Sequence, residues 1–246
     1  MRILSTGNGE REKQFRALCL ASGHQLPDHG PWDAAVLPLP RSDISEDTAD
    51  QLPRGQKVIC GRTDDPFDRL AKRRGWKLCR VLEDETYLLE NAALTSEGAV
   101  FAAMEESRFS LMGARCLVAG YGRIGKELTR RLRALDALVT VAARRPESRS
   151  EAGEGSVSIE EIPRVIGEMD LIFNTVPAPV IGWEALCCVR PGALLIELAS
   201  PPYGIDQEAA NALGLRCRLE SGLPGRYCPL SAAKALLDYL NREVSI

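Results

Sequence analysis

Short apolar runs alternate with amphipathic stretches through the first half of the chain. The apolar runs predict strands at Ile3–Ser5, Ala34–Leu37, Lys57–Cys60 and Lys77–Leu82, and a helix at Glu10–Ala21 follows the first of them. Helical stretches also separate the later runs. Helices and strands that alternate at this spacing form a parallel sheet with helices on its faces, so this half is predicted to be an α/β domain.

The same alternation is clearer in the second half. The predicted strands are Arg115–Ala119, Leu138–Ala142, Leu171–Asn174, Ala193–Leu198 and Leu215–Arg218. The predicted helices are Arg123–Leu135, Ile159–Ile166, Trp183–Cys188, Asp206–Leu213 and Pro229–Leu240. Five strands that alternate with helices predict a doubly wound, Rossmann-like nucleotide domain with a parallel sheet.

A longer helical pattern lies between the halves. We predict a helix from Thr95 to about Arg108, because Thr95 or Ser96 can cap it and Glu97 lies in its first turn, where the helix dipole favours a carboxylate. Three parts follow: an N-terminal α/β domain that carries substrate and catalytic groups (1–94), an interdomain helix (95–110) and a Rossmann domain (111–246).

Composition narrows the function classes. The 246 residues carry a formal net charge of −3, so no broad positive field favours nucleic acid or an anionic membrane. No run of about 20 apolar residues predicts a membrane span, and no apolar N-terminal segment predicts a secretory signal. We therefore expect a cytoplasmic protein with neither nucleic acid nor membrane as a partner.

Histidine and cysteine usage argues against two kinds of chemistry. With only His24 and His29 available, a zinc site or a Ser-His-Asp triad has little material, and we predict no metal. The eight cysteines contain no CxxC pair. We expect them to be small buried hydrophobes in a reducing compartment.

The glycine motif Gly120-Tyr121-Gly122-Arg123-Ile124-Gly125 follows a predicted strand directly and opens a predicted helix. In this context the first glycine permits the tight turn, the second lets a pyrophosphate approach the backbone, and the third lets helix and strand pack closely. The pyrophosphate would then lie at the helix N-terminus. A plain glycine turn is the alternative.

The end of the next strand indicates which cofactor binds. An NAD site usually has an acidic residue about 20 residues after the glycines, which binds the ribose 2′-hydroxyl. Here the strand ends in Ala142-Ala143-Arg144-Arg145, without an acid. Because arginine can bind a 2′-phosphate through paired hydrogen bonds, we predict NADP. A solvated arginine loop is the alternative.

Further strand ends point to the same crevice, since ligands of open α/β sheets bind outside the carboxyl ends of the strands. Candidate cofactor contacts at these ends are Asn174, Thr175, Val176 and Pro177, then Ala199 and Ser200, then Gly222, Leu223 and Pro224. Each segment is also compatible with ordinary turn chemistry. The turn Thr6–Arg11 has a similar place after the first strand, where Gly7 and Arg11 could bind a carboxylate or only form a turn.

These motifs resemble the family of the A subunit of dipicolinate synthase from spore-forming bacteria. The resemblance covers the glycine motif, Ala142–Arg144, Asp170–Pro177, Glu197–Ser200 and Gly222–Gly225. Asn91, Thr95–Gly98 and the pair Gly7 and Arg11 also fall where the family has similar residues, although Asn8-Gly9 departs from its usual Gly-Asp. Most of the chain is covered, with residues 12–80 matched only loosely.

The resemblance implies two Rossmann-like domains in a layout similar to the formate/glycerate dehydrogenase group, with the active site between them. It implies NADP-dependent oxidation of a dihydrodipicolinate-type intermediate, a small dicarboxylate, to dipicolinate. It also implies that the partner is a flavoprotein-like B subunit of dipicolinate synthase and that the protein works in the mother-cell cytoplasm during sporulation. Homo-oligomer formation is left open.

Few groups are available to bind and convert such a substrate. Arg11, Arg226, Thr95 and the amide of Gly7 are the predicted substrate partners. Glu97 is the candidate general base, because a carboxylate partly shielded between domains is suited to accept a proton. Its alternative role is that of a helix N-terminal acid that interacts only with the dipole.

Two departures from the family bear on these expectations. Leu230-Ser231 replaces a usual Lys-Thr, which removes one candidate cation near the site. Asp136 stands where relatives have glycine after the first Rossmann helix, and since Asp tolerates the left-handed conformation, we expect no change of fold.

Two rival functions are considered. A shikimate-dehydrogenase-like enzyme is one, because Asn174–Pro177 is similar to that group, although the first domain lacks the Lys and Asp pair its chemistry needs. A non-catalytic NADP-binding protein that works with a catalytic partner is the other, because fold alone does not establish catalysis.

Overall fold

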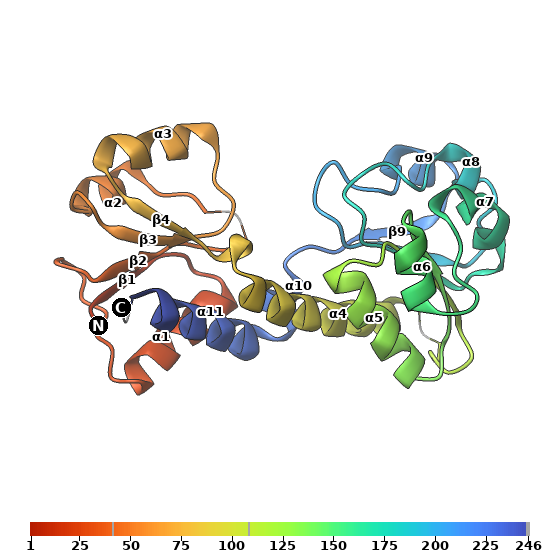
Figure 1. The fold of residues 1–246 in the computed structure, drawn as a ribbon, viewed down its shortest axis with the longest axis horizontal. Helices are drawn as coiled ribbons and strands as arrows, with labels where there is room; N and C mark the ends of the chain where they lie inside the picture. The colour runs from red at the N-terminus through yellow and green to blue at the C-terminus, as the bar shows by residue number, and fades with distance from the viewer. Residues whose placement is uncertain (41, 108, 245–246) are drawn as a thin grey trace. The chain divides into compact units, whose positions relative to one another are not determined.

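The computed structural model describes residues 1–40, 42–107 and 109–244. Arg108, the expected end of the interdomain helix, and Ile246, the expected end of the Rossmann domain, lie outside the described residues. The chain divides into two compact units, unit 1 (Met1–Leu94 with Pro224–Ile246) and unit 2 (Thr95–Leu223). Each unit contains a parallel sheet with helices (Figure 1), which confirms the predicted fold class.

Unit 1 contains a four-stranded parallel sheet in the order β1-β2-β3-β4. Its elements are β1 (Ile3–Ser5), α1 (Glu10–Ala21), β2 (Ala34–Val36), α2 (Glu46–Gln51), β3 (Lys57–Cys60), α3 (Asp65–Arg74), β4 (Lys77–Arg80) and η1 (Val81–Glu83). One more bridge pairs Arg2 with Gln25. The N–H of Ile3 donates to Gln25 while the carbonyl of Arg2 accepts from Asp33, so the Gln25 segment flanks β1 on the side away from β2.

With that segment counted as a strand, unit 1 has the flavodoxin-like strand order 2-1-3-4-5. The chain reverses direction across the sheet between β1 and β2. Ligands of open α/β sheets bind at the carboxyl ends of the two strands that flank such a switch point. The loops after β1 and β2 are therefore the functional end of this sheet.

Unit 2 contains a five-stranded parallel sheet in the order β6-β5-β7-β8-β9. Its elements are β5 (Arg115–Ala119), α5 (Arg123–Ala134), β6 (Leu138–Ala142), α6 (Pro146–Ala152), η2 (Ile159–Glu161), α7 (Ile162–Val165), η3 (Ile166–Glu168), β7 (Leu171–Asn174), α8 (Trp183–Leu186), β8 (Leu194–Glu197), α9 (Gln207–Ala212) and β9 (Arg216–Leu219). Val157 forms a bridge to Ala142 on the free side of β6. Counted as a strand, it gives the Rossmann order 3-2-1-4-5-6, with the switch point between β5 and β7.

The helix predicted to start at Thr95 is longer than expected. Helix α4 runs from Glu85 to Ser107, and the boundary between the two units falls within it. Asp84 caps its start, because its carboxylate accepts a hydrogen bond of 2.7 Å from the N–H of Tyr87. Thr95 and Ser96 are buried residues in the middle of α4, so their predicted capping role is wrong.

In unit 2, one helix prediction was wrong and one helix was not predicted. The predicted helix Ile159–Ile166 is broken into the short segments η2, α7 and η3. Helix α6 was not predicted, because its only buried residues are Ser148 and Ala152 and it has no apolar stripe. The expectation for Asp136 is confirmed, since its φ of 58° is left-handed.

The C-terminal helix α11 (Pro229–Val244) packs in unit 1, although the sequence assigned it to the Rossmann domain. It lies beside α1 (Figure 1). Leu236 and Leu240 of α11 share one apolar core with Phe15 of α1 and Ile59 of β3. Helix α10 (Leu223–Tyr227) precedes α11, and the boundary between units falls after its first residue.

The cysteines are only partly the buried hydrophobes that were expected. All eight are free thiols; Cys19, Cys60 and Cys116 are buried, whereas Cys187 and Cys188 are exposed. Burial raises the pKa of the Cys60 thiol to about 11, which keeps it protonated at neutral pH. Among the described helices, none combines the length and apolar character that a membrane crossing requires.

The packing of α11 predicts a local effect of Leu240→Ala. Leu240 is fully buried in the core of unit 1, so its truncation should cost about 2–5 kcal/mol. We expect faster hydrogen exchange in peptides of Met1–Leu94 and unchanged protection in Thr95–Leu223. Leu230→Ala, on an exposed position of the same helix, is the control. Loss of protection in unit 2 alone would contradict this assignment of α11.

Candidate functional site

The three glycines of the motif have different steric surroundings. Gly120 has a φ of +99°, and a Cβ there would overlap Oγ1 of Thr175. A Cβ at Gly125 would overlap the carbonyl oxygen of Gly120, so helix α5 can approach β5 only with glycine at this position. A Cβ at Gly122 would meet no atom within 4 Å. These are the surroundings of a turn glycine, a packing glycine and a glycine that faces open space.

The start of α5 has the features of an anion site. Gly122 is its N-cap residue, so the cap position itself carries no side chain. The helix runs for 12 residues, so its N-terminal N–H groups and dipole can stabilise a phosphate. Tyr121 borders the turn, with Nζ of Lys126 lying 5.5 Å from its ring centre.

Thr175 joins the ends of the two strands that flank the switch point. Its N–H and its Oγ1 donate to the carbonyl of Ala119 at 2.8 and 2.9 Å. Ala119 ends β5, and Thr175 follows β7. The structure thus brings the glycine motif and the segment Asn174–Pro177 together, as the sequence predicted.

Asn174 itself is fully buried and takes part in the framework of the unit. Its Nδ2 donates to Oε1 of Glu197 at 2.7 Å and to the carbonyl of Val176 at 3.0 Å, while its Oδ1 accepts from the N–H of Val176. A direct cofactor contact by this side chain would have to displace these bonds. Thr175 and Val176 are the partly exposed residues of this turn.

Glu197 is a buried carboxylate that sequence reasoning did not single out as a site residue. It is 0% exposed and accepts hydrogen bonds from the Asn174 amide and from three backbone N–H groups, those of Ala199, Gly204 and Ile205. Four donors at 2.7–2.9 Å suit an ionised carboxylate, which only accepts hydrogen bonds. Glu197 therefore fixes the loop after β8, where the candidates Ala199 and Ser200 lie partly exposed.

The end of β6 carries cations and no acid at the position that an NAD site would use. Arg144 and Arg145 are both exposed and follow the buried residues Ala142 and Ala143. Arg149, which the sequence did not indicate, donates from one Nη atom to the carbonyls of Ala143 and Arg144, both at 2.9 Å. The two predicted arginines thus lie on a loop that a third arginine holds.

Glu97, the candidate general base, is described within unit 2 alone. Within unit 2 its side chain is 52% exposed and forms an ion pair of 3.1 Å with Arg131 of α5. Arg131 is eight residues beyond the start of α5, which at 1.5 Å per residue is about 12 Å from the glycine end. Thr95 is buried within α4.

The remaining predicted contacts lie near the boundary between the units. Gly222 has a φ of +64° and lies in unit 2 with the buried Leu223, whereas Pro224 lies in unit 1. Arg226 is exposed and lies over the ring of Tyr227, 4.9 Å from its centre.

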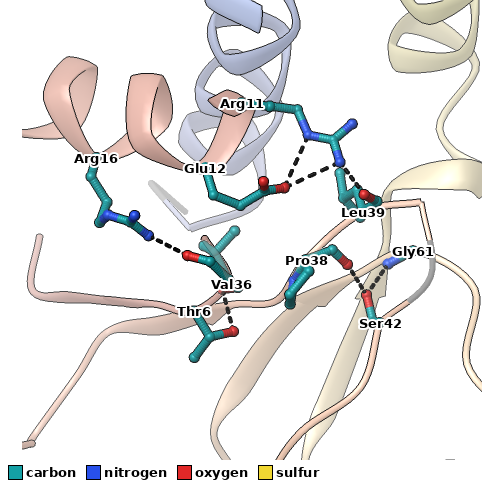
Figure 2. Close-up of polar contacts among 10 residues, drawn as sticks. Thr6, Arg11, Glu12, Arg16, Val36, Pro38, Leu39, Ser42 and Gly61 are labelled. Carbon is teal, nitrogen blue, oxygen red and sulfur yellow. Dashed lines mark hydrogen bonds and ion pairs between the residues drawn. The ribbon is translucent and has the colours of Figure 1, made fainter. Parts of the chain in front are cut away.

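The loops at the switch point of unit 1 form a second polar site (Figure 2). Arg11 is 7% exposed, and its Nε and one Nη both donate to Oε1 of Glu12 at 3.2 Å. The same Nη donates to the carbonyl of Leu39, so Arg11 links α1, which follows β1, to the loop after β2. The structure therefore places Arg11 at the functional end of this sheet.

Glu12 explains the glycines of the N-terminal turn. A Cβ at Gly9 would overlap Oε2 of Glu12, and a Cβ at Gly7, whose φ is +89°, would lie 2.9 Å from Pro38 and 3.1 Å from Glu12. Arg16 donates to the carbonyl of Gly7 at 2.8 Å.

Among the described residues, no group of three or more His, Cys, Asp or Glu side chains is arranged to hold a metal ion. The chemistry of both sites consists of backbone N–H groups, arginines and hydroxyls. Such groups recognise phosphates and carboxylates.

The comparisons with known proteins agree with this geometry. Residues 87–209 match the family model of the D-isomer specific 2-hydroxyacid dehydrogenase, NAD binding domain. The A subunit of dipicolinate synthase from Bacillus subtilis (strain 168) is 27% identical over 202 residues, which cover 81% of this chain and 68% of that protein. The resemblance to the A subunit of dipicolinate synthase is thereby confirmed.

Solved structures show the same fold. The crystal structure of the dipicolinate synthase A subunit from Bacillus halodurans superposes with a TM-score of 0.88 at 24% identity, covering 100% of this chain and 98% of that one. A transhydrogenase from Sinorhizobium meliloti superposes with a TM-score of 0.75 at 17% identity, covering 99% of this chain and 94% of that one.

The hydrogen bonds of Glu197 predict a strong effect of Glu197→Gln. An amide presents a donor where the carboxylate accepts from N–H groups, so at least one buried group loses its partner. We expect the free energy of unfolding of unit 2 to fall by about 3 kcal/mol, measured by native-state hydrogen exchange. Glu184→Gln, on an exposed residue of the same unit, should change it little. Equal protection in the two variants would contradict the framework role.

Proposed function

The chain belongs to the family of D-isomer specific 2-hydroxyacid dehydrogenase NAD-binding domains, and from this premise we propose that it is an NADP-dependent oxidoreductase with the role of the A subunit of dipicolinate synthase. Membership of this family supports an oxidoreductase fold with a nicotinamide dinucleotide site. The choice of NADP, the substrate and the reaction are our proposal.

The observation that carries the choice of NADP is the end of β6. Arg144 and Arg145 are exposed where a carboxylate would bind the 2′-hydroxyl of NAD. An acid at this position would repel a 2′-phosphate, whereas guanidinium groups attract it and can bind it through two parallel hydrogen bonds.

The described residues fit the rest of the cofactor. The open space at Gly122 and the glycine N-cap of α5 suit the pyrophosphate. Thr175 to Pro177, Ala199, Ser200 and Gly222 to Pro224 are proposed to border the nicotinamide end. When bound, NADP⁺ supplies a hydride acceptor, and the protein supplies position and charge.

The proposed substrate is a small dicarboxylate. Arg11, at the switch point of unit 1, would bind one carboxylate, and the N–H of Gly7, Thr95 and Arg226 are the further proposed partners. Oxidation of a dihydropyridine-type ring removes one hydride, which passes to NADP⁺, and one proton, and it yields an aromatic pyridine. Glu97, which is ion-paired with Arg131, is the proposed proton acceptor, and because aromatisation is strongly downhill the reaction does not require a strong base.

The resemblance also leads us to propose a partner and a place of action. A relative whose name marks it as one part of a synthase implies a second part. We propose that this partner is a flavoprotein-like B subunit of dipicolinate synthase. We propose the cytoplasm of the mother cell during sporulation as the place of action.

The first test is a titration of the purified chain with NADP⁺ and NAD⁺. We expect tighter binding of NADP⁺, by about tenfold or more, because an arginine contact to phosphate is a charge-assisted hydrogen bond. Addition of the aldolase product that feeds dipicolinate synthesis should then give NADPH absorbance at the rate at which pyridine dicarboxylate forms.

Other outcomes separate the rival functions. Selective NADP⁺ binding without turnover, whether the chain is alone or mixed with the flavoprotein-like partner, would favour a non-catalytic role or another substrate. Preference for NAD⁺ would overturn the role given to Arg144 and Arg145.

The substrate role of Arg11 predicts a change in KM. Arg11→Lys keeps the charge but loses the planar set of donors, and Arg11→Gln combined with Glu12→Gln removes both charges without leaving a buried acid unpaired. We expect KM for the dicarboxylate to rise about tenfold in both, with the Kd of NADP⁺ unchanged. Lys13→Gln, exposed on the same helix, is the control. An unchanged KM in both variants would remove Arg11 from the substrate site.

A further inference from the structure

Arg149 connects helix α6 to the loop that follows β6. One Nη atom of its guanidinium donates to the carbonyl oxygens of Ala143 and Arg144, each at 2.9 Å. These are the two residues directly after the strand. Arg149 thus contacts the backbone of the loop that carries Arg144 and Arg145, and not the side chains of these two residues.

The backbone of Arg149 is itself held in place. Its N–H donates to the carbonyl of Arg145, and its carbonyl accepts from the hydroxyl of Ser156 at 2.9 Å and from the N–H of Gly153 at 3.2 Å. Beyond Ser156, the N–H of Ala143 donates to Val157 at 3.0 Å. The loop, α6 and the Val157 bridge therefore form one closed set of hydrogen bonds at the edge of the sheet.

The side chains of Arg144 and Arg145 differ from that of Arg149 in their hydrogen bonding. Both are exposed, and among residues 1–40, 42–107 and 109–244 neither side chain has a hydrogen-bond or ion-pair partner. Of the three arginines between positions 144 and 149, Arg149 donates to the backbone, and Arg144 and Arg145 remain available to a ligand.

Two physical effects follow from this division. The carbonyl oxygens of Ala143 and Arg144 are turned toward Arg149, so they do not repel an anion bound by the loop. A fixed backbone also lowers the conformational entropy lost when the two long side chains become ordered around a phosphate. Both effects favour a ligand with a 2′-phosphate over one without it.

We propose that Arg149 is a positioning residue that sets the preference for NADP over NAD by holding the loop that presents Arg144 and Arg145. This inference rests on the proposed NADP function and adds to it a residue that does not contact the cofactor.

The test compares dissociation constants of NADP⁺ and NAD⁺ for Arg149→Met, which removes the donors and keeps an aliphatic chain. We expect NADP⁺ to bind about tenfold more weakly, as the loss of a hydrogen bond to a charged group implies, and NAD⁺ to bind with unchanged affinity. Arg149→Lys, which retains the charge and can reach a carbonyl, should lie between wild type and Arg149→Met.

A second background separates positioning from direct contact. In the double variant Arg144→Met/Arg145→Met, adding Arg149→Met should not weaken NADP⁺ binding further, because nothing remains to be positioned. Arg164→Met removes an exposed arginine of the same unit, beside the residues that begin β5 and β6, and should leave both constants unchanged.

Several results would overturn the inference. NADP⁺ binding by Arg149→Met at the wild-type affinity would remove its role. An equal weakening in the double-variant background would make Arg149 a phosphate ligand. An equal loss of NADP⁺ and NAD⁺ affinity would make it a structural residue. A wild-type chain that does not prefer NADP⁺ would overturn the proposed cofactor itself, before any variant is compared.

Discussion

The close approach of α5 to the end of β5 is the contact on which the nucleotide site depends. A side chain at Gly125 would overlap the carbonyl of Gly120, and a side chain at Gly120 would overlap Thr175. Glycine at both positions lets the start of the helix lie directly at the strand end, beside the end of β7. The N-terminal N–H groups of α5 thereby face the point where the sheet changes direction, which is where an open α/β sheet binds its ligand.

Unit 1 has the same kind of sheet but uses its switch point differently. Its turn after β1 lacks the third glycine, and a buried Arg11–Glu12 pair lies where the second unit offers an open helix start. Burial raises the pKa of the nearby Tyr87 hydroxyl, so that group stays neutral. The guanidinium of Arg11 is oriented by Leu39, and Glu12 compensates its charge. The two switch points thus differ: unit 2 presents an open helix start, and unit 1 presents a buried ion pair.

The sequence was sufficient where local pattern decides the outcome. The strands, the glycine motif and the left-handed Asp136 follow from apolar runs and from backbone requirements of single residues. The sequence was insufficient where the role of a residue depends on which other residue it contacts in the fold. The apolar stripe of α11 predicts a helix with one buried face, but not that the face packs on α1. A polar segment such as α6 has no periodicity to detect, and Glu197 and Arg149 become informative only once the N–H and C=O groups around them are known.

Glu197 and Arg149, which the sequence did not indicate, share a physical property that separates them from Arg144 and Arg145. Glu197 accepts from backbone N–H groups and Arg149 donates to backbone carbonyls, whereas Arg144 and Arg145 are exposed without partners among the described residues. A charge bound to backbone groups loses little by being buried, and it fixes the loop that bears it. A charge that stays in solvent has no desolvation cost until a ligand binds. These strand ends therefore carry both kinds: satisfied charges that hold the loops in place, and exposed charges on those loops, which are the ones proposed to select the ligand.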